Sequence, residues 1–324
     1  MSYGTICWNI KPPQQSVVIP NNFSISTAVD LMQLCVYTYN QYDKYIAANE
    51  EWTIPSPYKI EKTFYYYDDS KKVPFGFIAT SDNNKDVYIC FRGTRTVSEL
   101  KKNLNIELAP CSFLNDSNSK VHKGFQEVYV TSNSVNESLG SLRTQMLDYL
   151  NTDINQDYTT IWVSGHSLGA AIATLAVVDI VTNTSHIGAR MYNFASPLVG
   201  DQDFADYFKS KIGTNQCDKN NNSNNTCSWR IVNINDEVRK IPPQYFGYVH
   251  VNGCSGPGIC NNSGCSNSNS PECNNNDSSK NGLFEIEFEK RCNFLFTDIT
   301  CFEKAHRATT YLSKLQEINN IVNQ

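Results

Sequence analysis

The sequence predicts an α/β fold in which helices cover both faces of a mostly parallel central sheet. One observation is local: a short apolar, β-branched run at 159–163 leads into the turn GHSLG at 165–169, and an Ala-rich apolar helix pattern follows directly. The other concerns the whole chain, where runs typical of strands alternate with runs typical of helices. Such alternation is the pattern of parallel strands joined by helical crossovers.

The elements are expected in a regular order. Residues 1–26 predict an irregular N-terminal arm because Pro12, Pro13 and Pro20 block regular structure, and residues 27–324 predict one domain. Ser26 is a candidate cap for the first helix of that domain. Strand patterns cover 60–67, 75–80, 86–91 and 159–163. Residues 189–200 predict a strand leading into a Pro/Gly turn, and residues 229–243 predict a strand running into an acidic loop closed by two prolines. Helix patterns cover 27–46, 124–150 with a polar break near 131–136, 168–181, 201–212 and 301–324.

Two segments depart from this alternation. Residues 215–227 and 252–281 are rich in Asn, Ser, Gly and Cys and contain almost no apolar side chains. Because such segments cannot build a core, they are expected to be surface insertions.

The chain has twelve cysteines, a usage common in oxidised proteins and unusual in cytosolic enzymes. The cysteines of the second insertion lack the close C-x₂₋₄-C pairs of zinc sites, so disulfides are expected there and no metal. Cys217–Cys227 and Cys292–Cys301 are further candidate pairs, whereas Cys90, inside a strand pattern, is expected to be free.

Composition limits the possible partners. The net charge is −5 with 18% charged residues, which gives no basic surface for nucleic acid. No run of eighteen apolar residues predicts a transmembrane segment. The first twenty residues do not show a leader pattern, which conflicts with the cysteine usage, so the compartment stays open. We expect a monomer.

The strand–GxSxG–helix arrangement is a nucleophile elbow, which lifts the hydroxyl of Ser167 above the edge of the sheet. The alternative is an ordinary glycine-rich turn between a strand and a helix, without a catalytic role. A serine hydroxyl is a weak nucleophile, so Ser167 needs a general base, and the base needs a group that orients it.

In α/β-hydrolases the acid and then the histidine follow the nucleophile along the chain. Asp236 fits because it closes the apolar run 229–234 and begins a loop, with a capping role as the alternative. After it only His250 and His306 remain. His306 is preferred, since it lies in a loop position from which a base can reach across, whereas His250 sits in an aromatic strand pattern. Chain order argues against His122 and His166, a position within the helix after the elbow argues against Asp179, and a polar helix face argues against three further aspartates: Asp201, Asp203 and Asp206.

The oxyanion of a tetrahedral intermediate needs N–H donors. Leu168, the residue after the nucleophile, is expected to supply one, and Thr94, after the strand pattern ending at 91, the other. The alternative for 92–94 is a tight turn with Arg92 in an ion pair.

Six motifs together give the chain a resemblance to the class 3 lipases, the fungal lipase-like family of α/β-hydrolases. They occur in the family's order: FRGT at 91–94, VHKGF at 121–125, GHSLGAA at 165–171, NFASPLVGDQDFADYF at 193–208, RIVNINDEVRKIPP at 230–243 and AHRATTYL at 305–312. The resemblance implies Ser167 as nucleophile, Asp236 as acid and His306 as base. It also implies Thr94 and Leu168 as oxyanion donors.

The expected function is hydrolysis of lipid carboxylic esters through an acyl-enzyme, without metal or organic cofactor. Triacylglycerol lipase, phospholipase A1 and feruloyl-type esterase share these motifs and are not separated by the sequence. A non-catalytic lipid-binding protein on the same scaffold is the rival, and the complete set of catalytic residue types argues against it.

Residues 96–108 show an apolar stripe at three- and four-residue steps, formed by Val97, Leu100, Leu104 and Leu108. The stripe predicts an amphipathic helix. Its place after the oxyanion loop, together with the resemblance, predicts a lid that covers Ser167 in water and opens at a lipid surface. An ordinary surface helix is the alternative.

Overall fold

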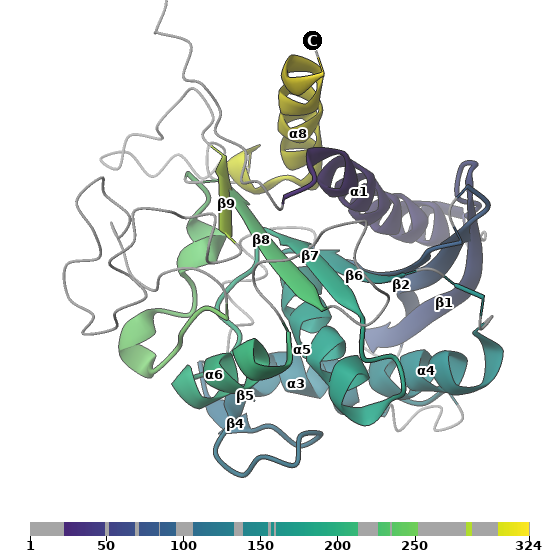
Figure 1. Cartoon of the computed structure of the whole chain (residues 1–324). Helices are drawn as coiled ribbons and strands as arrows, with labels where there is room; N and C mark the ends of the chain where they lie inside the picture. Colours follow the sequence, from purple (N-terminus) through teal and green to yellow (C-terminus); the bar gives the residue numbers. More distant parts are fainter. Residues whose placement is uncertain are drawn as a thin grey trace, which may run out of the picture.

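A computed structural model describes most of the chain (Figure 1). The described residues are 23–48, 52–68, 71–83, 85–94, 106–132, 139–154, 157–158, 160–212, 226–233, 235–251, 283–286 and 304–323. The predicted N-terminal arm up to residue 22 and nearly all of both predicted insertions lie outside them.

Seven strands form the central sheet in the order β1-β2-β3-β6-β7-β8-β9. β1 and β2 pair antiparallel, as do β2 and β3, whereas β3, β6, β7, β8 and β9 all run parallel. The strands are β1 (Tyr58–Asp68), β2 (Lys71–Ser81), β3 (Val87–Phe91), β6 (Ile161–His166), β7 (Arg190–Phe194), β8 (Cys227–Asn233) and β9 (Leu283–Ile286). The predicted mostly parallel sheet is therefore confirmed.

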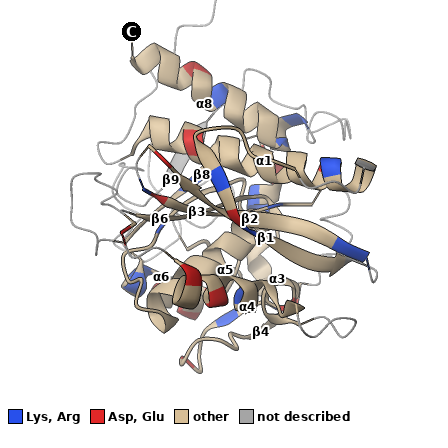
Figure 2. Ribbon diagram, turned by 90° about the vertical axis from the view of Figure 1, so that its right-hand side faces the viewer, with Lys and Arg blue, Asp and Glu red and all other residues tan. Residues whose placement is uncertain are grey.

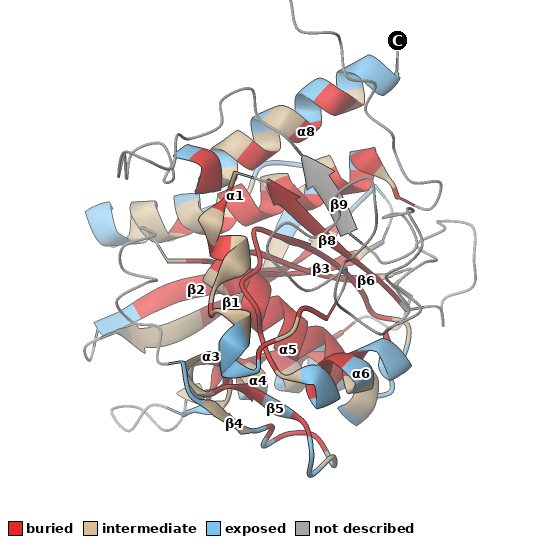
Figure 3. Cartoon of the chain, turned by 90° about the vertical axis from the view of Figure 1, so that its left-hand side faces the viewer, coloured by how far each residue is buried: buried red, intermediate tan, exposed pale blue. Residues whose placement is uncertain are grey.

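The inner parallel strands are buried over their whole length, as continuous apolar runs predict for strands covered on both faces. On one face lie α3 (Lys123–Val130), α4 (Leu142–Asp148), α5 (Leu168–Asn183) and α6 (Gln202–Lys211), and on the other lie α1 (Ile25–Ala48) and α8 (Ala308–Val322) (Figure 1). Figure 3 shows α5 as buried almost throughout, which agrees with its apolar composition.

Smaller elements complete the fold. β4 (Leu108–Pro110) and β5 (Lys120–His122) form a two-stranded antiparallel sheet. A π-helical turn, η2 (Tyr149–Asp153), extends α4, and two 3₁₀ turns, η3 (Glu237–Lys240) and η4 (Gln244–Phe246), follow β8. The strand expected to begin near residue 229 ends at Asn233, and the loop expected from Asp236 follows it. The backbone turns at Asp236, whose side chain accepts a hydrogen bond from the N–H of Val238.

The cysteines divide by position. Cys35, Cys90 and Cys111 are free and buried, which confirms the prediction for Cys90. Cys227, the first residue of β8, is disulfide-bonded, and its partner lies outside the described residues. The pairing predicted for it therefore stays a prediction.

Charged side chains of both signs are spread over the helices and strand ends (Figure 2). Within the described ranges, no helix is long and apolar enough to cross a bilayer.

Candidate active site

The turn between β6 and α5 holds Ser167 in a strained backbone conformation. Its φ is 61° and its ψ is −127°, a region that side-chain-bearing residues rarely adopt. Gly165 and Gly169 permit the turn, because a Cβ on Gly165 would collide with the backbone of the helix and one on Gly169 with the carbonyl of Phe91. The spacing of the GxSxG motif therefore follows from close backbone contact on both sides of the serine.

Three side chains from distant parts of the chain form one hydrogen-bonded row. The hydroxyl of Ser167 lies 2.8 Å from Nε2 of His306, and Nδ1 of His306 lies 2.7 Å from Oδ2 of Asp236. An ionised carboxylate can only accept, so the ring proton sits on Nδ1 and Nε2 accepts from the serine hydroxyl. Ser167 starts α5, Asp236 follows β8, and His306 precedes α8. Ser167 and Asp236 are fully buried and His306 nearly so.

Asp236 is held by more than the histidine. Its Oδ2 also accepts from the hydroxyl of Tyr311 at 2.9 Å, and its Oδ1 accepts from the N–H of Val238 at 2.9 Å. The Tyr311 oxygen in turn accepts from the N–H of Asn233 at 2.7 Å. Burial and the nearby carboxylate of Asp236 hold the pKa of Tyr311 well above its usual value, so the phenol stays a donor. These bonds fix the direction in which Asp236 faces the imidazole.

His306 is positioned through its backbone. Nε2 of His166 lies 2.7 Å from the carbonyl oxygen of His306, and Nδ1 of His166 lies 2.9 Å from the hydroxyl of Tyr39 on α1. Burial, and then the neighbouring His306, hold the pKa of His166 well below its usual value. The neutral ring must therefore donate from Nε2 to the carbonyl and accept from Tyr39 at Nδ1.

The sequence reasoning missed these supporting side chains. It discarded His166 as a base, correctly, but assigned it no other part. The sequence did not identify Tyr39, Asn233 or Tyr311 as parts of the site. A single aromatic or amide residue within a helix or strand pattern is equally consistent with an ordinary core or surface position.

Of the two predicted oxyanion donors, Leu168 follows the nucleophile directly in the chain, and Thr94 follows Gly93, whose backbone lies close to the serine. Leu168 is the first residue of α5, and its side chain packs with Val238 and Ile241. A Cβ on Gly93 would lie 2.9 Å from the Cβ of Ser167, so the backbone leading into Thr94 runs against the serine. Arg92 donates to the carbonyl of Gly93 at 2.6 Å and to that of Pro74 at 3.3 Å. The 92–94 turn is thereby anchored to β2.

Several other histidines and aspartates considered from the sequence make hydrogen bonds outside the row of Ser167, His306 and Asp236. Nε2 of His250 lies 2.8 Å from the carbonyl of Arg239, and burial holds its pKa well below the usual value. The structure thus places His250 outside the row, as the sequence argument preferred. His122 caps α3, His186 bonds Tyr158 and Leu150, Asp179 bonds Arg143 and Tyr129, and Asp201 caps α6.

The predicted lid is corrected at one end. Leu108 lies in β4, where it pairs with His122, so it is not part of an amphipathic helix. The antiparallel pairing across β4 and β5 fixes this residue in extended backbone. Val97, Leu100 and Leu104 lie outside the described residues, and the lid over them stays a prediction.

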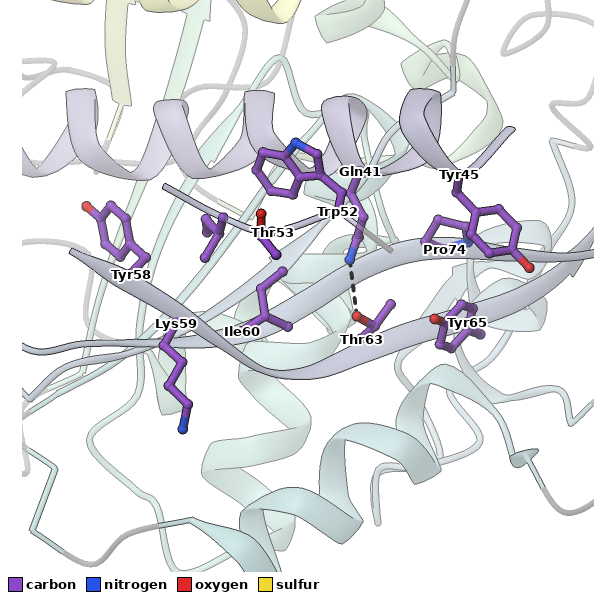
Figure 4. A pocket seen from close by; sticks show the side chains of 11 residues that line it. Gln41, Tyr45, Trp52, Thr53, Tyr58, Lys59, Ile60, Thr63, Tyr65 and Pro74 are labelled. Atoms are coloured by element: carbon purple, nitrogen blue, oxygen red, sulfur yellow. Dashed lines mark hydrogen bonds between the residues drawn. The ribbon is translucent and has the colours of Figure 1, made fainter. Parts of the chain in front are cut away.

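A cavity of about 350 Å³ lies elsewhere, between α1, the segment 52–54 and the strands β1 and β2 (Figure 4). Tyr45, Trp52, Tyr58 and Tyr65 contribute to its wall, and none of the three residues of the row does. It is therefore separate from the chemistry at Ser167. Among the described residues, no cluster of His, Cys, Asp or Glu could hold a metal ion.

Comparison with known proteins agrees with this geometry. The family model described as lipase (class 3) matches residues 88–246. A Rhizomucor miehei lipase is 27% identical over 250 residues, covering 73% of this chain and 61% of the relative. A rice phospholipase A1-II 1 (Oryza sativa subsp. indica) is 32% identical over 152 residues, covering 42% and 39%.

Structural comparison agrees as well. A Rhizomucor miehei lipase propeptide complex superposes with a TM-score of 0.52 at 26% identity, over 69% of this chain and 65% of that one. The chain thus spans less than two thirds of the length of these relatives. The family match contains the elbow with Ser167 and also Asp236, and His306 follows it along the chain. In sequence and in fold, the chain is similar to the class 3 lipases.

Proposed function

We propose that this protein hydrolyses carboxylic esters of lipids through a covalent acyl-enzyme on Ser167. The observation that carries the proposal is the unbroken row from the Ser167 hydroxyl through the His306 ring to Asp236, with bonds of 2.8 and 2.7 Å. A non-catalytic lipid-binding protein would have no need of a buried serine held in a strained conformation against a general base.

The proposed roles follow the order of the hydrogen-bonded row. Ser167 Oγ attacks the ester carbonyl carbon while Nε2 of His306 takes the hydroxyl proton. Asp236, already hydrogen-bonded to Nδ1, stabilises the imidazolium. The negative oxygen of the tetrahedral intermediate accepts from the backbone N–H groups of Leu168 and Thr94. On collapse the C–O bond to the alcohol breaks and His306 returns the proton to the leaving oxygen.

The second half-reaction uses the same groups. His306 takes a proton from water, the hydroxide oxygen attacks the acyl carbon, and the bond to Ser167 Oγ breaks. The fatty acid leaves and Ser167 regains its proton from His306. Each step is complete with the side chains of this chain and water, and the proposal calls for no metal or organic cofactor.

The substrate class has two candidates on this fold. Triacylglycerol is favoured by the longer match, to a fungal lipase, and a phospholipid cleaved at one acyl ester is favoured by the higher identity to a rice phospholipase A1. A panel of triacylglycerols and phospholipids of increasing chain length separates them. The disulfide at Cys227 supports an oxidising compartment, and we further propose that the protein acts there as a monomer.

The direct test is Ser167→Ala. We expect loss of hydrolysis of a short p-nitrophenyl ester by about 10⁴-fold or more in kcat, with an unchanged melting temperature, because alanine fits the turn. His306→Ala should be comparably severe, and His250→Ala should leave the rate nearly unchanged. A His250 variant that lost more activity than the His306 variant would contradict the assignment of the base.

A further inference from the structure

The cavity beneath α1 is lined by aromatic rings from separate parts of the chain. Tyr45 comes from α1, Trp52 from the segment before β1, and Tyr58 and Tyr65 from β1 itself, at one end of the sheet (Figure 4). The volume of about 350 Å³ lies near the lower end of the roughly 300–1,000 Å³ that small-molecule sites occupy. The cavity therefore has the size and the ring-rich wall of a site for a small ligand.

Neighbouring side chains hold these rings in place. Tyr37 on α1 packs against Trp52, with ring centroids 5.4 Å apart. Tyr45 meets Tyr65 edge to face, with ring centroids 6.3 Å apart. The ammonium of Lys72 lies 4.0 Å from the ring centroid of Tyr65. The ring surfaces are thus positioned by contacts within the protein, which lowers the cost of ordering them around a ligand.

Hydrogen-bonding groups belong to the same wall. Gln41 is 4% exposed, and its Nε2 donates to the hydroxyl of Thr63 at 3.1 Å. Its Oε1 has no hydrogen-bond partner among the residues that the structure describes, although buried polar atoms are nearly always paired. The Gln41 amide thus has unused hydrogen-bonding capacity. A hydroxylated ligand suits it whichever end of the amide faces the cavity, because a hydroxyl both donates and accepts.

The wall offers no unpaired charge. Among its described residues Lys59 alone is charged, and its ammonium lies 3.1 Å from the carboxylate of Glu61. Figure 4 shows Lys59 extending away from α1 and from Gln41 and Tyr45. An ionised ligand would lose its hydration without gaining a charge partner, so the wall favours a neutral ligand.

We propose that this cavity binds a neutral saccharide of one or two sugar rings. The apolar C–H face of a sugar packs on an aromatic ring, as Trp52 and Tyr65 provide, while its hydroxyls exchange hydrogen bonds with the Gln41 amide and the Thr63 hydroxyl. The inference goes beyond the proposed function, since a sugar without an ester is no substrate for Ser167.

A fatty-acid chain fits this wall less well. It requires a continuous aliphatic lining and a cation for its carboxylate. The aliphatic members of the described wall are Ile54, Ile60 and Pro74, and the ammonium of Lys59 is already paired. The combination of rings, amide and hydroxyls distinguishes a sugar site from a site for a reaction product of the proposed lipid hydrolysis.

The test is isothermal titration calorimetry of the whole protein with a defined panel of neutral sugars. The panel contains glucose, galactose, mannose, N-acetylglucosamine, maltose, cellobiose, lactose and N,N′-diacetylchitobiose, with dodecanoate and phenol as ligands of other classes. At least one saccharide should bind saturably. It should also change the tryptophan fluorescence, because it covers the ring of Trp52.

Variants of the wall locate the site. Trp52→Ala should weaken saccharide binding about 10- to 100-fold, as expected for losing one large apolar contact. Gln41→Leu, which keeps the side-chain size, should weaken it about 2- to 10-fold through the lost hydrogen bond. Trp52→Phe should retain binding in calorimetry but lose the fluorescence change.

A matched control is an exposed tyrosine outside the wall. Tyr245 on η4 is 80% exposed, and Tyr245→Ala should leave saccharide binding unchanged. The melting temperature of each variant establishes that it is folded, independently of any esterase activity. If Trp52→Ala did not fold, Gln41→Leu and the fluorescence of Trp52→Phe would decide the location of the site.

Four results would overturn the inference: no saturable binding of any saccharide in the panel, unchanged binding in the folded wall variants, an equal loss in Tyr245→Ala, or tighter binding of dodecanoate or phenol than of every saccharide. Failure of the protein to cleave esters would remove the proposed function and leave the calorimetric result intact.

Discussion

Two buried aspartates, Asp179 on α5 and Asp236 after β8, have different hydrogen-bond partners. Asp179, on α5, accepts from the guanidinium of Arg143 at 2.7 and 3.1 Å, from Tyr129 at 2.8 Å and from Asn183 at 2.6 Å. Asp236, after β8, accepts from His306 at 2.7 Å, Tyr311 at 2.9 Å and the N–H of Val238 at 2.9 Å. Both side chains are fully buried.

The difference lies in the partner. Arg143 is a permanent cation, so the charge of Asp179 is balanced in every state of the protein. In the proposed reaction, the partner of Asp236 is a ring that gains a proton when Ser167 loses one. In that proposal the carboxylate stabilises a charge that exists only during the reaction. Burial and hydrogen bonding alone do not identify a catalytic acid; the titratable partner that reaches a nucleophile does.

The largest expected effect separates the two aspartates by rate. Asp236→Asn should lower kcat for a soluble ester by on the order of 10⁴-fold, because an amide disrupts the tautomer and charge that the ring needs. Its melting temperature should change little, since the amide fits the same space. A kcat within tenfold of the unsubstituted protein would show that Asp236 is not the acid.

Asp179→Asn should show the opposite pattern. Removing a buried carboxylate from its cation costs about 3–5 kcal/mol, and the low end is expected because the Arg143 side chain is 31% exposed. The free energy of unfolding from urea titration should fall by about that low-end amount, while kcat stays near its original value. A large loss of kcat without loss of stability would mean that the α5 face takes part in the chemistry.

The two tyrosines sharpen the comparison. Tyr311→Phe removes a donor to Asp236 and leaves the buried N–H of Asn233 without its acceptor, whereas Tyr129→Phe removes only a donor to Asp179. We expect Tyr311→Phe to lower kcat about tenfold and stability by about 1–3 kcal/mol. Tyr129→Phe should lower stability alone. Equal kcat values for the two variants would place Tyr311 outside the catalytic arrangement.

The smallest effect concerns a buried histidine that lacks a carboxylate partner. Burial lowers the pKa of His122 to about 4 from an ordinary 6.5. The unfolded chain therefore takes up this proton first as the pH falls. The stability contributed by the neutral ring is complete above pH 6.5 and is lost as the pH falls from 6.5 toward 4, by at most about 1.4 kcal/mol per pH unit.

His122→Asn keeps a capping side chain at the start of α3 and removes this proton. The drop in melting temperature between about pH 7 and about pH 5 should become shallower in the variant. An identical drop would indicate that other buried histidines, such as His166 and His250, carry the acid sensitivity.

The amino-acid sequence by itself determined the elements that depend on local pattern. The run at 159–163, the glycines at 165 and 169 and the Ala-rich helix after them define a turn that only one backbone geometry satisfies, so Ser167 was identifiable without coordinates. The parallel sheet followed from alternating strand and helix patterns, and chain order reduced five histidines to two.

Tertiary structure decided what depends on contacts between distant segments. Tyr39, Asn233 and Tyr311 come from α1, β8 and α8, and only the packing of both helices on one face of the sheet brings them to His166, His306 and Asp236. Leu108 fits a helical stripe in sequence, yet its pairing with His122 makes it a strand residue. The spacing of hydrophobic residues predicts which side of an element is apolar. Contacts with segments far along the chain determine whether that element is a helix or a strand and which polar groups meet.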